Sequence, residues 1–285
     1  MMYRQTTATR RKTIVLTSKY AYMKILRDGL LSTLLLFTFS HPTTAQTDSK
    51  PVVPDWALPG SATHKQVPPP PDFHRAPVTS MIPLGLFQGQ TDVGAALVPG
   101  SSTYNPATGQ YTIVSAGYNI WYNRDEFRYV WKKMSGDVSL AIDPSFPDAA
   151  GYDDRKAVLV IRQNLDDDGK EAVVALHGGG LMHLAWRAKK GEMMQETRVN
   201  HRRDHTTDSL NTGLAKRIGI EKHGDAFTVY ISMHGEPMHQ IGDAIQLHLD
   251  APFYVGIGFC SHLPATTDTA ILSNVLLVNS AGKLH

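Results

Sequence analysis

From Gly85 onward, the sequence is a succession of short apolar segments separated by Gly, Asn and Asp. Two of these segments, Lys156–Gln163 and Glu171–His177, are almost continuously apolar, as in central strands that are buried on both faces. The acidic stretch Asp166–Gly169 between them has the composition of a tight turn, so the two segments are predicted to form a hairpin. No segment of ten or more residues has the periodicity of an amphipathic helix. This pattern predicts an all-β fold.

Ten further segments of similar length are predicted to be strands. They are Gln110–Ala116, Glu126–Lys133, Gly136–Asp143, Leu181–Arg187, Gly191–Val199, Leu214–Lys222, Phe227–Met233, Ala244–Leu249, Phe253–Ser261 and Thr269–Val278. A dozen short strands with regular turn signals, and no repeat of propeller or solenoid period, are typical of a β-sandwich or a barrel.

The first 45 residues have the organisation of a cleavable signal peptide. An apolar run, Leu30–Phe39, follows Lys24 and Arg27 and precedes small residues at positions 43 and 45. About ten apolar residues are too few to span a bilayer, which needs roughly 20, so a membrane anchor is the less favoured alternative. Met23 would open a leader of ordinary length. We therefore expect an exported protein, periplasmic or secreted, with no transmembrane segment in the mature chain.

Residues 46–83 are rich in proline and have little hydrophobic periodicity, which predicts an extended, semi-rigid spacer. The alternative is a tail that wraps on the folded domain through Trp56 and Phe73. The folded domain itself is predicted over residues 84–280.

Charge and cysteine content restrict the partners. The first 45 residues contain seven of the 28 Lys and Arg but one of the 26 Asp and Glu, so the remainder has a net charge near −4. A basic footprint for nucleic acid or anionic lipid is therefore not expected. Cys260 is the only cysteine and lies in an apolar strand, so we expect a buried thiol and no lipid-modified N-terminal cysteine.

Several strands resemble one group of β-sandwich domains. The segments are Lys132–Leu140, Arg155–Gln163, Arg217–Asp225, Tyr254–His262 and Ile271–Val275. Together they resemble the laminin-G and β-xylosidase-C-terminal-like branch of the concanavalin A-like lectins and glucanases. Closer still is the domain found ahead of TolB-like β-propellers in exported bacterial proteins.

The resemblance extends over residues 87–278 and implies a two-sheet antiparallel sandwich of the jelly-roll type. No propeller sequence occurs before His285, so a Tol-type transport role is not expected. One fold of this kind serves many activities, so the resemblance constrains function weakly.

Catalytic signals are sparse. Laminarinase-type enzymes on this fold carry a Glu-x-Asp-x-x-Glu run on one strand, which places the carboxylates in one cleft. This sequence has no such run, and its strand acids Glu126, Asp137, Glu171 and Glu221 lie on different strands. Asp137 and Asp225 are interpreted as turn residues. A glycoside hydrolase or lyase is therefore an alternative, and we lean against an enzyme.

Glycan binding requires aromatic faces for sugar rings and planar polar groups for hydroxyls. A sheet of this type offers candidates for both: Trp121, Trp131, Arg162, Gln163, His177, Trp186 and Arg187. The alternative is that Trp131 and Trp186 are core residues and Arg162 belongs to a structural ion pair, because strand parity is uncertain by one residue. A non-catalytic module that binds a glycan or cell-envelope polymer is the favoured hypothesis. The third hypothesis is an envelope scaffold or protein-interaction domain.

No cofactor is expected, although a calcium ion at a rim of the sandwich stays open. Asp166–Asp168 have calcium-loop composition, but His177 stands where an EF-hand needs Glu, so a solvated turn is favoured. His201 and His205 lie four apart in a polar segment without a third ligand, which indicates a surface insertion. The glycines after His177 lack the Lys-Ser/Thr of a phosphate loop and predict a hairpin turn.

Overall fold

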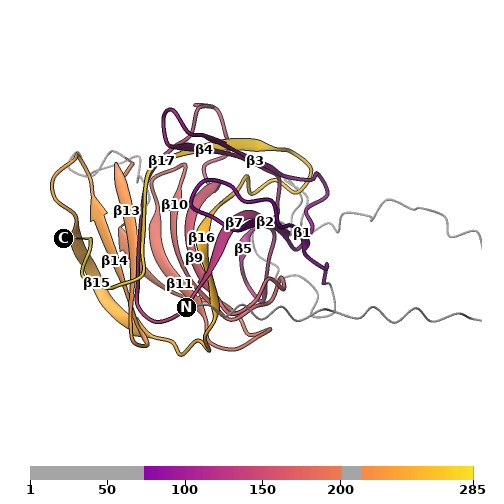
Figure 1. Ribbon diagram of the computed structural model, residues 1–285. Helices are drawn as coiled ribbons and strands as arrows, with labels where there is room; N and C mark the ends of the chain where they lie inside the picture. Colours follow the sequence, from indigo (N-terminus) through magenta and orange to yellow (C-terminus); the bar gives the residue numbers. More distant parts are fainter. Residues whose placement is uncertain (1–73, 201–213, 285) are drawn as a thin grey trace, which may run out of the picture. The chain divides into compact units, whose positions relative to one another are not determined.

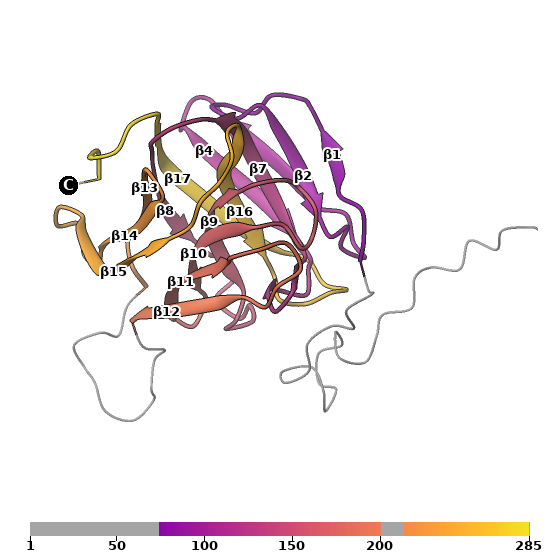
Figure 2. The same cartoon turned by 90° about the horizontal axis from the view of Figure 1, so that it is seen from below.

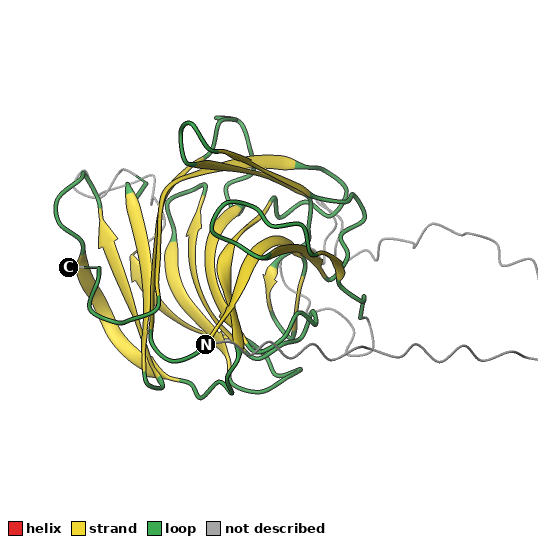
Figure 3. Cartoon of the chain, viewed as in Figure 1, coloured by secondary structure: helices red, strands yellow, loops and turns green. Residues whose placement is uncertain are grey.

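The computed structural model describes residues 74–200 and 214–284. These residues form two large antiparallel sheets and one short hairpin, and no helix occurs within them (Figure 3). Consequently, no helix in this part of the chain is long and apolar enough to cross a membrane. The predicted leader (1–45), most of the predicted spacer, His201 and His205 lie outside the described residues.

The first sheet has eight strands in the order β1-β2-β7-β16-β9-β10-β11-β12 (Figure 2). Their bounds are β1 (Val78–Ser80), β2 (Gly89–Val93), β7 (Phe127–Met134), β16 (Phe253–Cys260), β9 (Lys156–Arg162), β10 (Glu171–His177), β11 (Met182–Arg187) and β12 (Gln195–Asn200). The strands on either side of β16 are distant from it in sequence, so the middle of this sheet depends on long-range pairing.

The second sheet has seven strands in the order β15-β14-β13-β8-β17-β4-β3 (Figures 1 and 2). Their bounds are β15 (His239–Gln246), β14 (Ala226–Ser232), β13 (Arg217–His223), β8 (Val138–Ser145), β17 (Asp268–Val278), β4 (Gln110–Ser115) and β3 (Ser101–Asn105). The remaining hairpin consists of β5 (Ile120–Trp121) and β6 (Arg124–Asp125). The predicted all-β, two-sheet sandwich is confirmed.

Side-chain alternation divides each strand of the eight-stranded sheet between two environments. On β9, Ala157, Leu159 and Ile161 enter the main core between the sheets. Val158 and Val160 point the other way and join a second apolar cluster. We call the face that carries this second cluster the outer face. Because both faces are covered, β9 and β10 are buried along their whole length, as their continuous apolar sequences predict.

Several predicted boundaries shift. The sheet begins at Val78, within the segment predicted to be a spacer, because β1 pairs with β2. The strand predicted over Ala244–Leu249 runs instead from His239 to Gln246, since β14 pairs with these residues through an irregular register. The hairpins between β9 and β10 and between β10 and β11 form as predicted. Gly180 has φ +88°, a conformation that the second turn needs and that glycine adopts without strain.

Candidate functional site

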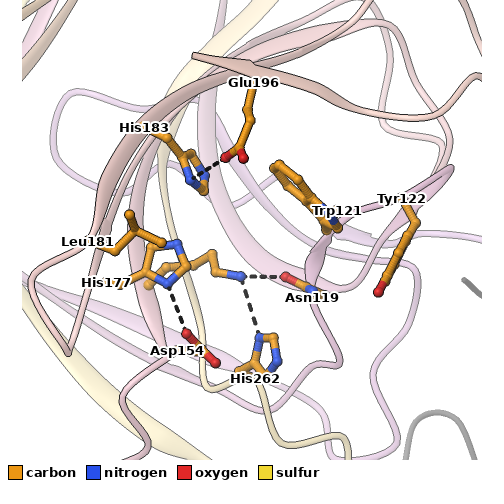
Figure 4. A pocket seen from close by; sticks show the side chains of 10 residues that line it. Asn119, Trp121, Tyr122, Asp154, His177, Leu181, His183, Glu196 and His262 are labelled. Atoms are coloured by element: carbon orange, nitrogen blue, oxygen red, sulfur yellow. Dashed lines mark hydrogen bonds and ion pairs between the residues drawn. The ribbon is translucent and has the colours of Figure 1, made fainter. Parts of the chain in front are cut away.

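The β5–β6 hairpin covers the middle of the outer face and leaves a cavity of about 310 Å³ at one end of the strands. We call this cavity the histidine pocket (Figure 4). Its lining residues are Asn119, Trp121, Tyr122, Asp154, Lys156, His177, Leu181, His183, Glu196 and His262. They come from the hairpin, from adjacent ends of four strands and from the turn after β16.

Three side chains from neighbouring strands form the floor. Lys156 begins β9 and pairs in register with His177, the last residue of β10, while His183 lies on β11. All three are about 95% buried or more, because the hairpin lies over them. The ammonium of Lys156 donates to Oδ1 of Asn119 and lies 3.4 Å from Nδ1 of His262. A buried amine therefore lies among polar side chains at the base of the cavity.

Two imidazole–carboxylate pairs flank the floor. Nδ1 of His177 lies 3.6 Å from Oδ1 of Asp154, and Nδ1 of His183 lies 3.4 Å from Oε2 of Glu196. The two imidazole rings meet edge to face with centroids 5.1 Å apart. Figure 4 shows the two carboxylates on different sides of the pocket, each beside its own imidazole. A carboxylate beside Nδ1 orients the ring, as binding and proton transfer both require.

The rim is aromatic and its backbone is strained. The ring of Trp121 lies 5.4 Å from that of His183. Tyr122 and His262 have φ values of +55° and +64°, and only two other non-glycine residues within the described ranges have positive φ. Such backbone costs about 1–3 kcal/mol per residue and tends to occur at functional sites. Stacking of His262 on Tyr152, at 5.4 Å between centroids, helps to hold this conformation.

A buried ion cluster lies at the opposite end of the same strands. It consists of Arg162, Arg187, Asp125 and Glu171, whose side chains are all fully buried. Arg187 donates to both oxygens of Asp125, at 2.9 and 2.8 Å, and to Glu171 at 3.1 Å. Arg162 lies 3.3 Å from Asp125 and 3.5 Å from Glu171. These contacts join the β5–β6 hairpin to β9, β10 and β11.

The pKa values of the two carboxyls in the ion cluster are shifted in opposite directions. Burial raises the pKa of Glu171 to about 8, with the Asp125 carboxylate adding to the increase and Arg162 and Arg187 opposing it. Burial also acts to raise the pKa of Asp125, but the Arg187 guanidinium outweighs it and holds that pKa below its ordinary value. The cluster therefore keeps Asp125 ionised and favours a proton on Glu171.

The acidic turn after β9 differs from its predicted solvated state. Asp167 and Asp168 are buried. Asp167 accepts hydrogen bonds from the backbone N–H of Arg75 at 3.0 Å and contacts Nδ1 of His74 at 2.9 Å. Arg75 also donates to Glu126 at 3.2 Å. Asp167 is therefore an anchor for residues 74–75, which explains why its carboxylate is buried, whereas the side chain of Asp166 stays 44% exposed.

The seven residues predicted to bind a ligand are dispersed. Trp121 and His177 line the histidine pocket. Arg162 and Arg187 belong to the buried ion cluster, so Arg162 takes the structural role weighed as its alternative. Gln163 exchanges two hydrogen bonds with the backbone of Asp250, at 2.8 and 2.9 Å.

The two remaining tryptophans also lie outside the pocket. Trp131 is buried within the outer-face cluster, where its indole N–H donates to Thr91 at 2.8 Å. Trp186 is half-buried and packs against the main core between the sheets. Trp186 and Arg187 are neighbours on β11, so their side chains face opposite sides of the sheet and could not both have lined one site.

Sequence reasoning missed most of the pocket, including Lys156, His183 and His262. The sequence pattern could have revealed the first two. Each is a polar residue in a buried strand, two positions away from a small apolar residue whose side chain points to the same face. Lys156 shares its face with Val158, and His183 shares its face with Ala185. His262 and Asn119 lie in loops, where no periodicity marks them.

Metal ligation has no support in the part of the chain that the structure describes, where no three His, Cys, Asp or Glu side chains are arranged around a common point. Calcium at a rim of the sandwich stays a prediction. Cys260 is buried as expected, and burial raises the pKa of its thiol to about 11.

No protein-family model matches the sequence, and no curated protein does. Similar solved structures include a carbohydrate-binding module from Bacillus subtilis, with 14% identity, 67% of this chain and 96% of that chain covered, and a TM-score of 0.41. An alginate lyase from Klebsiella pneumoniae has 12% identity, coverage of 63% and 84%, and a TM-score of 0.38. A functionally unknown protein from Saccharomyces cerevisiae has 11% identity, coverage of 64% and 97%, and a TM-score of 0.45. At such identities the similarity concerns the fold alone.

Proposed function

We propose that the chain is an exported glycan- or polymer-binding β-sandwich and that the histidine pocket is its binding site. The observation that carries the proposal is the convergence, in one cavity, of ring faces with polar groups. Trp121 and His183 supply ring faces, while Asn119, Glu196 and Lys156 supply acceptors and a donor. Sugar recognition needs this combination, because a pyranose has both an apolar C–H face and a belt of hydroxyls.

The size and rigidity of the pocket support a short contact with a polymer. A volume of about 310 Å³ lies at the lower end of the roughly 300–1,000 Å³ found for small-molecule sites. The surrounding packing holds the strained backbone at Tyr122 and His262, so rim side chains are in place before the ligand arrives. Preorganisation of this kind reduces the entropy cost of binding.

Pull-down on cell-wall and plant polysaccharides, together with a glycan array, tests the proposal. Trp121→Ala and His183→Ala are expected to abolish retention, because each removes a ring from the pocket. His239→Ala is the matched control, since His239 is an exposed histidine on the other sheet. Failure of the wild type to bind any polysaccharide overturns the proposal, and so does equal retention of the pocket variants.

A second candidate is an enzyme that acts on glycans. The two imidazole–carboxylate pairs favour it, because a carboxylate that orients an imidazole is the usual support for a general base or acid. Release of reducing ends or of unsaturated products from a bound polysaccharide would support this candidate. Asp154→Asn and Glu196→Gln should then lower turnover more than binding, whereas a purely binding pocket would release no product.

Export is part of the proposal. The predicted leader supports it, and N-terminal sequencing of the periplasmic or secreted protein is expected to begin near residue 46. A scaffold role in the envelope, alongside a TolB-like partner, stays a third hypothesis. Association with such a partner that survives Trp121→Ala would favour it over glycan binding.

A further inference from the structure

A second and larger cavity, of about 710 Å³, opens at the β1 edge of the eight-stranded sheet. We call it the β1 groove. Its walls are apolar, with Met81 and Leu86 on the segment after β1, Leu165 on the acidic turn, and Trp131 and Tyr254 on the strands beneath. A cavity of this size with apolar walls and few polar groups is the usual form of a small-molecule site.

The segment beside the groove is unusually apolar for a surface. Six large apolar side chains are exposed in the described part of the chain, and four of them lie within nine consecutive residues. These four are Val78, Met81, Ile82 and Leu86, with exposed fractions of 60%, 65%, 68% and 48%. An exposed apolar cluster next to a cavity indicates a ligand or partner that covers it.

The polar groups in the walls already have partners. The hydroxyl of Thr79 is hydrogen-bonded to that of Thr91 at 3.0 Å, and the indole N–H of Trp131 donates to the same Thr91 hydroxyl. The side-chain oxygen of Gln88 accepts from the backbone N–H of Lys133 at 3.0 Å. A sugar would find few groups here to satisfy its hydroxyls, so the walls favour an apolar body instead.

A lysine provides the charge at this groove. Lys132 and Lys133 both line the groove, and no acidic residue does. The ammonium of Lys133 lies 5.1 Å from the centre of the Tyr254 ring, which places a cation at the apolar wall. Lys132, the preceding residue on β7, points to the other face of the sheet, so Lys133 supplies the cation. An ammonium group at an apolar wall complements a ligand with one apolar and one anionic end.

We propose that the β1 groove binds an anionic amphiphile, with its apolar body along Met81, Leu86 and Leu165 and its carboxylate or phosphate at Lys133. This site is independent of the histidine pocket and of the glycan proposal. A single molecule fits better than a bilayer surface, because residues 46–285 carry a net charge near −4 and an anionic membrane would repel them.

Isothermal titration of the full chain with decanoate and with decyl phosphate, below their micelle-forming concentrations, tests the proposal and distinguishes the two anionic groups. Decyltrimethylammonium has a comparable apolar chain with the opposite charge. We expect one or both anionic probes to bind and the cationic probe to bind at least tenfold more weakly. Equal affinity for the cationic probe, or no binding of either anion, overturns the proposal.

Matched variants locate the binding. Lys133→Gln is expected to weaken anion binding by about tenfold or more. Met81→Ser is expected to weaken the binding of the apolar chain. Lys216→Gln and Met193→Ser change an exposed lysine and an exposed methionine outside the groove, and they should leave affinity unchanged.

Every protein compared carries the same N-terminal residues, so a contribution from the leader cancels. Equal loss in the control and groove variants would refute the assignment to the groove. Two further results overturn the proposal. One is sedimentation with phosphatidylglycerol vesicles without binding of single molecules. The other is a dimer that Met81→Ser dissociates, since the apolar segment would then be a contact between copies of this chain.

Discussion

The buried ion cluster makes the sharpest prediction about stability, and Arg187→Met tests it. Methionine fills much of the same space but removes the hydrogen bonds of the guanidinium to Asp125 and Glu171, and those to the backbone of Gly169 and Glu192. Arg162 is then the one remaining cation of the cluster, and it faces two carboxyls. Breaking a buried pair in this way lowers the free energy of unfolding by about 3–5 kcal/mol. This is a large part of the roughly 5–15 kcal/mol that is the total free energy of unfolding of a typical domain.

Urea denaturation followed by circular dichroism measures the effect as a change in midpoint at constant slope. The matched control is Arg217→Met, because Arg217 pairs with Asp143 at 2.5 Å but both side chains are 23% exposed. Loss of such a surface pair is expected to cost about 1 kcal/mol or less. If Arg187→Met unfolds at the same urea concentration as the control, the hairpin is not held by the cluster.

Three further predictions concern buried groups. The pKa of Glu171 is raised to about 8, so the folded protein binds this proton more tightly than the unfolded chain. The resulting contribution to the free energy of unfolding is fully present below the ordinary pKa of 4.5 and is lost as pH rises to about 8. Glu171→Gln should therefore gain stability relative to the wild type over this range, by at most about 1.4 kcal/mol per pH unit, and parallel urea midpoints between pH 5 and 9 would contradict this. Gly256→Ala should prevent folding, since a Cβ there would lie 2.0 Å from the carbonyl oxygen of Val130; Gly179→Ala, whose nearest contact would be 3.3 Å, should stay folded by circular dichroism. Cys260, whose pKa is about 11 through burial, should resist a thiol reagent in the native protein and react in urea, so rapid native labelling would refute its burial.

Local signals were sufficient for much of the sandwich. Glu171–His177 was predicted with its observed bounds, and the turns on either side of it form the predicted hairpins. Both features depend on residues that are close in sequence: turn residues that reverse the chain, and apolar runs that need burial on two faces. The strand His239–Gln246 was displaced in the prediction because most of its side chains are exposed and give no apolar pattern.

The sequence by itself determined that the folded domain is all-β, where its most apolar strands lie, and which side chains share a face of such a strand. It did not determine what covers each face. Lys156 and Arg162 share the outer face of β9, yet one lies at the floor of a pocket and the other in a buried ion cluster. Only the tertiary structure decides this, because the β5–β6 hairpin that separates the two ends is remote in sequence from the strands it covers. The position of β16 between β7 and β9 has the same cause.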